Sequence, residues 1–289
     1  MLSRKIFFII VLVPIFSAQA LALDLMDSSE SQAKTDSIKS KVLKVTRKYS
    51  VFFPKSYFTQ REKKYPVLYL LHGLNGNNNN WIKYGRLQNI ADSVTNAGDA
   101  CEMVIIMPDA SSLKDGYFDM EGWPYETFFF KEFIPFIEKT YRIIADKPHR
   151  AIAGLSMGGG GATAYALKHP GMFSSVYAMS ALMTLPKQDR VQIMKPEMAE
   201  LGKSVLSNDC VAFVAHTDEA TLEKLRTVRW FIDCGDDDFL LDANYRFYRE
   251  MQQAKVPCQL RVRDGNHTWE YWQSALCMAL PFVSDGFGK

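Results

Sequence analysis

A serine stands between glycines in the pentapeptide GLSMG, residues 154–158. The pentapeptide directly follows the apolar stretch RAIAG and opens a segment of small residues typical of a helix. A strand, a sharp turn and a helix in this order form a nucleophile elbow, in which flanking glycines let a strained turn expose the serine hydroxyl. We therefore predict that Ser156 is a nucleophile. A phosphate-binding loop is the other interpretation of the glycine run 158–161, but the run lacks the lysine that would meet a phosphate.

A serine hydroxyl is a poor nucleophile at neutral pH, so it needs a base within hydrogen-bond distance. Three histidines follow Ser156 in the sequence. His169 ends the helix expected after the elbow, and His216 lies in an irregular stretch. His267 lies in the loop DGNHT just after the last expected strand, a position from which its imidazole can reach the serine. We predict that His267 is the base.

The base needs a third group that fixes its tautomer, normally a carboxylate. Four aspartates crowd the segment IDCGDDDF that follows an expected strand: Asp233, Asp236, Asp237 and Asp238. Their spacing does not choose among them. Four inward carboxylates would repel one another, so we expect one to orient the histidine and the other three to be solvated.

An oxyanion hole needs two backbone N–H groups directed at the developing negative charge. Met157, the residue after the serine, supplies the first at a helix start. The second is expected from Leu74, because Gly73 lets the backbone after an earlier strand approach the site closely. His72 in the same stretch is predicted to be structural.

Six apolar stretches bounded by charged or turn-forming residues are typical of strands buried on both faces. They span residues 66–71, 102–108, 150–154, 174–179, 229–234 and 258–262. Helical patterns separate them, most clearly at 126–141, where phenylalanines recur at steps of three and four residues. This alternation predicts an α/β fold with a mostly parallel central sheet, helices on both faces and the site at the carboxyl ends of the strands.

Two other segments complete the expected organisation. Residues 42–54 alternate between apolar and polar types, which predicts two short strands or a bent hairpin after the polar segment 27–41. Residues 182–228 are polar and helix-prone and interrupt the alternation. We interpret them as a lid-like helical insertion near the active site, with a longer structural crossover as the alternative.

The N-terminus has the layout of a secretory signal peptide over residues 1–22. Two basic residues precede an apolar run, and small residues allow cleavage after Ala20 or Ala22. The apolar run is shorter than the roughly 20 residues that a membrane span needs. We therefore expect export to the periplasm or the extracellular space, no stable membrane insertion, and one domain over residues 23–289.

Charge composition and cysteine spacing argue against a nucleic-acid partner, a zinc site and a disulfide-rich scaffold. Lys and Arg number 34 and Asp and Glu 32, without a charged block, so no nucleic-acid partner is expected. Five cysteines are scattered without CxxC spacing, which argues against a zinc site or a disulfide-rich scaffold. An odd number leaves at least one thiol unpaired, and Cys234 and Cys258 fit buried apolar positions.

Four motifs in order, YPVLYLLHG, RAIAGLSMGG, DCGDDDFL and DGNHTWEYW, resemble the "Putative esterase" family related to esterase D. That family includes feruloyl and acetyl esterases, S-formylglutathione hydrolases and mycolyltransferases, and the likeness runs from about residue 42 to 282. It implies an α/β-hydrolase fold and a Ser-Asp-His triad without cofactor or metal. The family motif places the acid at Asp238 and uses the amides of Leu74 and Met157 as the oxyanion hole.

Aromatic residues near the expected site suggest the substrate. Trp123, Tyr125 and Trp269 are candidates for stacking on a sugar or phenolic ring, whereas Trp272 is expected in the core. We therefore expect a small-molecule or oligosaccharide ester, a feruloyl or acetyl ester of plant cell-wall polysaccharide. The alternatives are an acyltransferase of the mycolyltransferase type, which would differ in excluding water, and a non-catalytic carbohydrate-binding relative.

Overall fold

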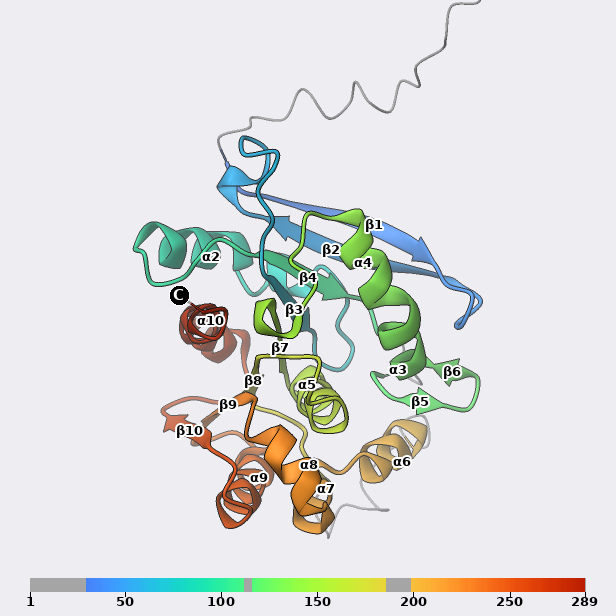
Figure 1. The fold of residues 1–289 in the computed structure, drawn as a ribbon. Coiled ribbons are helices and arrows are strands. Elements are labelled where there is room, and N and C mark those ends of the chain that lie inside the picture. Colours follow the sequence, from blue (N-terminus) through green and yellow to red (C-terminus); the bar gives the residue numbers. More distant parts are fainter. Residues whose placement is uncertain (1–29, 112–115, 186–198, 289) are drawn as a thin grey trace, which may run out of the picture.

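A computed structural model describes residues 30–111, 116–185 and 199–288 of the chain (Figure 1). The expected signal peptide, 1–22, and residues 186–198 of the expected insertion lie outside these ranges. The described chain forms a central eight-stranded sheet with the order β1-β2-β4-β3-β7-β8-β9-β10. Strand β2 runs opposite to all the other strands of the sheet, because it pairs antiparallel with both β1 and β4.

The six apolar stretches form the parallel part of the sheet. They are β3 (Val67–Leu71), β4 (Val104–Pro108), β7 (Arg150–Leu155), β8 (Ser175–Met179), β9 (Arg229–Gly235) and β10 (Cys258–Arg263). Each lies within a residue or two of its expected bounds. Four of them, β3, β4, β7 and β8, are buried along their whole length, as expected for strands covered on both faces.

The antiparallel start of the sheet differs from expectation. The first strand, β1 (Gln32–Lys39), lies in the segment taken as merely polar, and it pairs in register with β2 (Thr46–Phe53). Residues 42–54 therefore hold one strand and not two. Most of β1 is exposed or half-buried, because it is an edge strand that joins the sheet through backbone hydrogen bonds and contributes little to the core.

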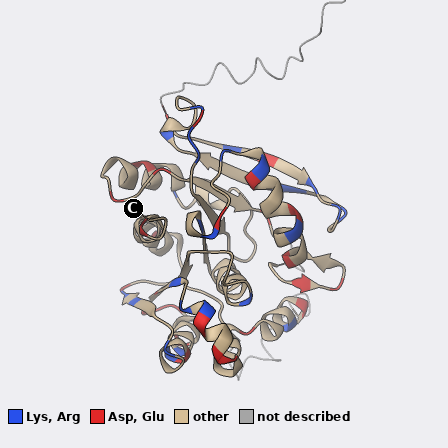
Figure 2. Ribbon diagram, in the orientation of Figure 1, with Lys and Arg blue, Asp and Glu red and all other residues tan. Residues whose placement is uncertain are grey.

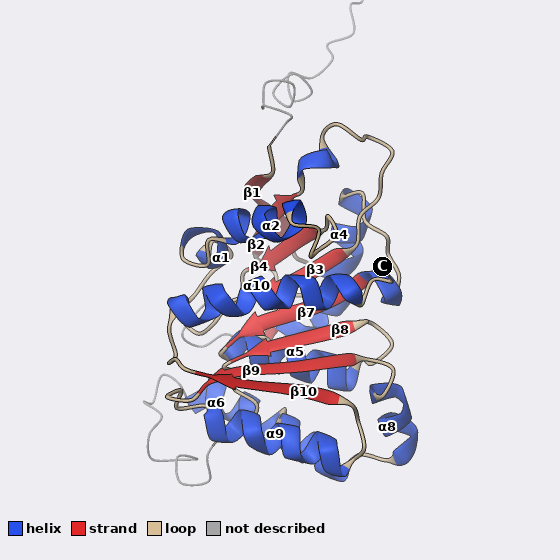
Figure 3. Cartoon of the chain, turned by 90° about the vertical axis from the view of Figure 1, so that its left-hand side faces the viewer, coloured by secondary structure: helices blue, strands red, loops and turns tan. Residues whose placement is uncertain are grey.

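Helices cover both faces of the sheet (Figure 3). On one face, α2 (Leu87–Asn96) and α10 (Trp269–Asp285) pack on each other and on the strands, and the short α1 (Asn80–Lys83) adjoins α2. On the other face lie α4 (Ile134–Thr140), α5 (Met157–Lys168) and α9 (Leu241–Gln253). The two cores share the strands, whose side chains alternate between them.

The expected helix at 126–141 is present but interrupted. It consists of α3 (Tyr125–Phe128), a π-helical turn over Phe129–Phe133 and α4. Pro135 stands in the first turn of α4, where it has no N–H to donate and its ring crowds the carbonyl of the preceding turn. The wider π turn accommodates this proline. A short hairpin of β5 (Asp119–Met120) and β6 (Trp123–Pro124) precedes α3.

The described part of the 182–228 segment is helical. It holds α6 (Ala199–Ser207), α7 (Cys210–His216) and α8 (Glu219–Leu225). Helix α7 packs against α5 and α9, so this part of the segment forms an outer layer over one face of the core (Figure 1).

Acidic and basic residues are interspersed along the described ribbon, without a long block of one sign (Figure 2). No helix in the described ranges is long and apolar enough to span a bilayer. All five cysteines are free: Cys210 and Cys234 are buried, Cys101 and Cys258 are half-buried, and Cys277 is exposed. Cys234 thus lies in the core as expected, whereas Cys258 is covered only in part.

Candidate active site

Ser156 occupies a strained turn between β7 and α5. Its backbone has φ 54° and ψ −120°, a conformation that a residue with a side chain rarely adopts. Two glycines allow the backbone to pack closely here. A Cβ on Gly154 would lie 2.4 Å from the Gly158 carbonyl oxygen on the other arm of the turn, and a Cβ on Gly158 would lie 2.4 Å from the His72 carbonyl oxygen in the neighbouring loop. The expected elbow is therefore present in the backbone.

The structure brings Ser156, His267 and Asp238 together from three strand ends. The His267 Nε2 lies 3.0 Å from Ser156 Oγ, and its Nδ1 lies 2.9 Å from Asp238 Oδ2. Ser156 follows β7, Asp238 follows β9 and His267 follows β10. With Nδ1–H donating to the carboxylate, Nε2 is free to accept the serine proton.

Asp238 is built to remain ionised. Burial on its own would raise its pKa, but hydrogen bonds from His267, the Leu240 N–H and Ser180 outweigh burial and hold the pKa below the ordinary value for aspartate. A charged Asp238 stabilises the imidazolium that forms when His267 takes a proton.

The other three aspartates have different surroundings. Asp236 and Asp237 are exposed, as expected, and Asp236 accepts a hydrogen bond from the Gly265 N–H at 3.0 Å. Asp233 is fully buried, contrary to the expectation of a solvated side chain, because it accepts hydrogen bonds from the hydroxyls of Tyr177 (2.6 Å) and Tyr271 (2.5 Å). These bonds replace the water that a buried carboxylate loses.

Two N–H groups at the site are available to an oxyanion. Those of Leu74, after β3, and Met157, at the start of α5, have no hydrogen-bond partner within the described residues. Met157 directly follows Ser156, and Gly73, the residue before Leu74, lies against Leu155 and Ser156. Their availability fits the expected oxyanion hole.

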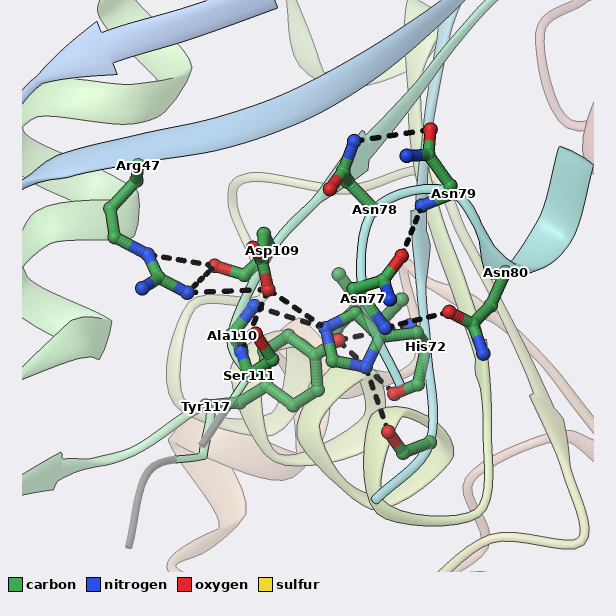
Figure 4. Close-up of polar contacts among 12 residues, drawn as sticks. Arg47, His72, Asn77, Asn78, Asn79, Asn80, Asp109, Ala110, Ser111 and Tyr117 are labelled. Carbon is green, nitrogen blue, oxygen red and sulfur yellow. Dashed lines mark hydrogen bonds and ion pairs between the residues drawn. The ribbon is translucent and has the colours of Figure 1, made fainter. Parts of the chain in front are cut away.

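His72 holds the loop that carries Leu74 (Figure 4). Its Nδ1 lies 2.7 Å from the Gly73 carbonyl oxygen, and its Nε2 accepts the Ala110 N–H at 3.0 Å. The Tyr117 hydroxyl accepts from the His72 N–H and donates to the His72 carbonyl. Burial lowers the pKa of His72, which keeps the ring neutral and preserves this donor and acceptor pair. The structural role expected for His72 agrees with these contacts.

The asparagines after Leu74 brace the same loop (Figure 4). Asn77 Oδ1 accepts the Asn79 N–H at 2.9 Å, and the Asn77 N–H donates to Asn80 Oδ1 at 2.8 Å. Asn78 reaches back to Ser50 on β2 at 2.7 Å. The polar loop is therefore tied to the sheet.

An open cavity of about 620 Å³ lies over Ser156 and His267. Its lining includes Trp269, one of the three residues predicted to bind substrate, together with Phe239 and Trp272. None of its lining residues comes from the described part of 182–228. The imidazole of His267 contacts two aromatic rings, those of Phe239 (ring centroids 4.6 Å apart) and the largely buried Trp272 (4.9 Å).

Trp123 and Tyr125 lie elsewhere. Tyr125 is fully buried, and its hydroxyl donates to the Asp109 carbonyl at 3.0 Å. A buried ring cannot contact a substrate, so Tyr125 is a core residue and the expectation of substrate contact is corrected. Trp123 is half-buried, stacks on Tyr125 at 5.7 Å and does not line the cavity.

Three features of the site were not predicted from the sequence: Phe239 at the cavity, the Asp233 cluster and the ring contacts of His72. Only Phe239 had a signal, because it directly follows the candidate acids. In the described ranges, no group of three or more His, Cys, Asp or Glu side chains is placed to hold a metal ion.

The model of the family described as "Putative esterase" matches residues 40–283. The chain belongs to this esterase family. A solved ferulic acid esterase structure is 54% identical to it, with a TM-score of 0.86 over 90% of this chain and 99% of that one. The acetyl esterase of Caldicellulosiruptor saccharolyticus is 25% identical over 232 residues, 75% of this chain and 83% of that protein.

A third similar protein is the endo-1,4-beta-xylanase/feruloyl esterase of Xylanibacter ruminicola. It is 32% identical over 133 residues, 44% of this chain and 18% of that longer protein. The resemblance to the esterase family and the mostly parallel α/β-hydrolase fold are thereby confirmed. This esterase is a serine hydrolase of carboxylic esters.

Proposed function

We propose that this esterase is exported and hydrolyses feruloyl or acetyl esters of plant cell-wall polysaccharide through an acyl-enzyme on Ser156. The observation that carries the proposal is the hydrogen-bonded chain from Ser156 through His267 to Asp238 at the floor of an open cavity. The 54% identity to a ferulic acid esterase supports the substrate class.

In the proposed reaction, His267 Nε2 accepts the Ser156 proton while Oγ attacks the ester carbonyl. The N–H groups of Leu74 and Met157 stabilise the oxyanion. His267 then donates the proton to the alcohol oxygen as the C–O bond breaks, which leaves an acylated serine. Water, deprotonated by His267, releases the acid and restores Ser156.

A labelling experiment tests the nucleophile. A fluorophosphonate probe should label the mature protein but not Ser156→Ala, which should also lose turnover by about 10⁶-fold. Labelling of Ser156→Ala at an unchanged rate would contradict the proposal.

A matched pair of aspartate variants tests the acid. Asp238→Asn removes the charge that orients His267 and should lower kcat by about 10⁴-fold. Asp236→Asn, two residues earlier and exposed, should keep turnover within about twofold, because its amide oxygen can still accept the Gly265 N–H and no contact with His267 is lost. The reverse order of effects would move the acid to Asp236.

The substrate class is tested by product release. The mature protein should release ferulate or acetate from feruloylated or acetylated xylan. Hydrolysis of short nitrophenyl esters with no release from either xylan would contradict this substrate class while leaving the esterase chemistry intact.

Export is tested on the protein recovered from its native cells. The mature chain should be found outside the cytoplasm and should begin at Leu21 or Leu23, the residues after the two small-residue cleavage patterns. Recovery of an uncleaved chain from the cytoplasm would contradict export.

A further inference from the structure

The aromatic side chain of Phe239 is exposed to solvent beside the active site. It is 72% exposed, the highest value among the exposed large hydrophobic residues of the described ranges, although its neighbours Asp238 and Leu240 are buried. Isolated exposed apolar residues are common and need no explanation. The position of Phe239 is unusual, because its ring lines the cavity and lies 4.6 Å from the imidazole of His267.

Proton transfer fixes which part of an ester meets this ring. When the acyl-enzyme forms, the alcohol oxygen must lie near His267 Nε2 to receive its proton. The group that this oxygen carries therefore leaves past the side of the imidazole. Trp272 packs on the ring from the core, whereas Phe239 lies on it with most of its surface in solvent. Phe239 is thus placed to contact the alcohol part of the ester.

The cavity also offers polar groups beside this aromatic surface. Its lining includes Asn80, Thr268 and Glu270. Asn80 Oδ1 accepts the Asn77 N–H, and its amide nitrogen has no partner within the described residues. An apolar ring face near polar side chains, one of which has an unpaired amide nitrogen, suits a sugar, which has apolar C–H faces and a rim of hydroxyls.

We propose that Phe239 is the platform on which the sugar ring of the leaving alcohol stacks, so that this residue selects for carbohydrate esters over simple alkyl esters. The proposal rests on the proposed hydrolysis at Ser156 and deepens it. Phe239 determines the alcohol specificity, and the acyl group contacts other parts of the cavity.

The test compares two esters that share an acyl group and differ only in the alcohol. Methyl ferulate and a feruloylated oligosaccharide from xylan form such a pair. For Phe239→Ala, the ratio of kcat/KM for the oligosaccharide ester to kcat/KM for methyl ferulate should fall by about 5- to 10-fold, the size expected for a lost stacking contact. Phe239→Trp, which restores a ring, should return the ratio to the wild-type value.

Two controls separate contact from general damage. Tyr245→Ala removes another exposed aromatic ring, on α9 and outside the cavity lining, and should leave the ratio unchanged. Labelling of Phe239→Ala by a fluorophosphonate shows that Ser156 and His267 still act together in the variant.

Two outcomes overturn the proposal. If Phe239 only shields His267 from water, kcat/KM falls equally for both esters and the ratio stays constant. If the ring touches nothing, neither value changes. Failure of the wild type on both feruloyl esters contradicts a feruloyl specificity instead. The same ratio is then measured with methyl acetate and an acetylated xylo-oligosaccharide, so the alcohol contact is still tested.

Discussion

At the scale of single residues, His267 depends on contacts on three sides. Asp238 fixes its tautomer, Ser156 lies at Nε2, and the rings of Phe239 and Trp272 pack against the imidazole. These contacts come from three separate segments: the elbow, the loop after β9 and the start of α10. The imidazole is therefore oriented before any substrate binds, which reduces the reorganisation that catalysis requires.

The pH dependence of turnover follows from these contacts. Activity needs a neutral His267 and a charged Asp238, and the pKa of Asp238 is held below the ordinary aspartate value near 4. Protonation of Asp238 therefore adds nothing to the acid limb above about pH 4.5, so log(kcat/KM) on a soluble ester should fall with a slope of no more than about one down to that pH. Rates measured from pH 4.5 to 8 check this. A slope approaching two would show that Asp238 titrates in the same range.

At the scale of elements, the turn between β7 and α5 depends on close backbone contact. A methyl group on Gly158 would overlap the His72 carbonyl oxygen, which lies in the loop that also carries Leu74. The elbow and the oxyanion loop are thus packed on each other, and neither can move alone.

Gly158→Ala should therefore be strongly destabilising. We expect a loss of about 3 kcal/mol in the free energy of unfolding, because the backbone must shift to fit the methyl group, and a Tm lower by about 6–12 °C. Gly171→Ala is the matched control, since a Cβ there meets no atom within 4 Å. Thermal melts of both variants measure the difference. Equal Tm values would show that the backbone around Gly158 accommodates a methyl group without loss of stability.

Elements whose side chains pack in the core could be predicted from the sequence, whereas elements that contribute little to the core pattern were missed. The buried strands were visible because two-sided burial requires continuous apolar runs. Strand β1 was not, because its side chains are mostly in solvent and only its backbone joins the sheet. The π turn before Pro135 was missed because its phenylalanines keep a helical spacing.

The candidate site shows the same limit. The serine and histidine follow strands whose ends can be predicted from the sequence, so the proximity of the two side chains could be expected. The acid was not resolved by spacing, because burial separates Asp233 and Asp238 from Asp236 only once the chain is folded. The family motif pointed to Asp238, and the structure places that carboxylate against His267.

At the scale of the whole molecule, Asp233 ties the strands beneath the site together. Its carboxylate on β9 accepts from Tyr177 on β8, Tyr271 on α10 and Arg263 on β10. These elements converge below the loop that carries His267. The geometry of the site is therefore held by a buried polar cluster as well as by the apolar cores.

Substitution of the two buried aspartates should consequently have different effects, one mainly on stability and the other mainly on turnover. Asp233→Asn should cost about 2 kcal/mol of unfolding free energy, the scale of a charged hydrogen-bond network whose Arg263 partner stays partly exposed to water. Asp238→Asn should lose turnover with a smaller loss of stability. Urea unfolding and ester hydrolysis measured on both variants test this. Equal stability of the two variants would show that the hydrogen bonds of Asp233 do not hold these elements together.

The distribution of thiols has a practical consequence. Burial raises the pKa of Cys234 and Cys258 to about 12 each and that of Cys210 further still, whereas Cys277 is exposed on the outer side of α10. Cys277 lies about 12 Å along the helix axis from Trp269, given the rise of an α-helix. A maleimide should thus couple at Cys277 before it reaches Cys210, Cys234 or Cys258, so this exposed thiol is a site for attaching a dye or a solid carrier.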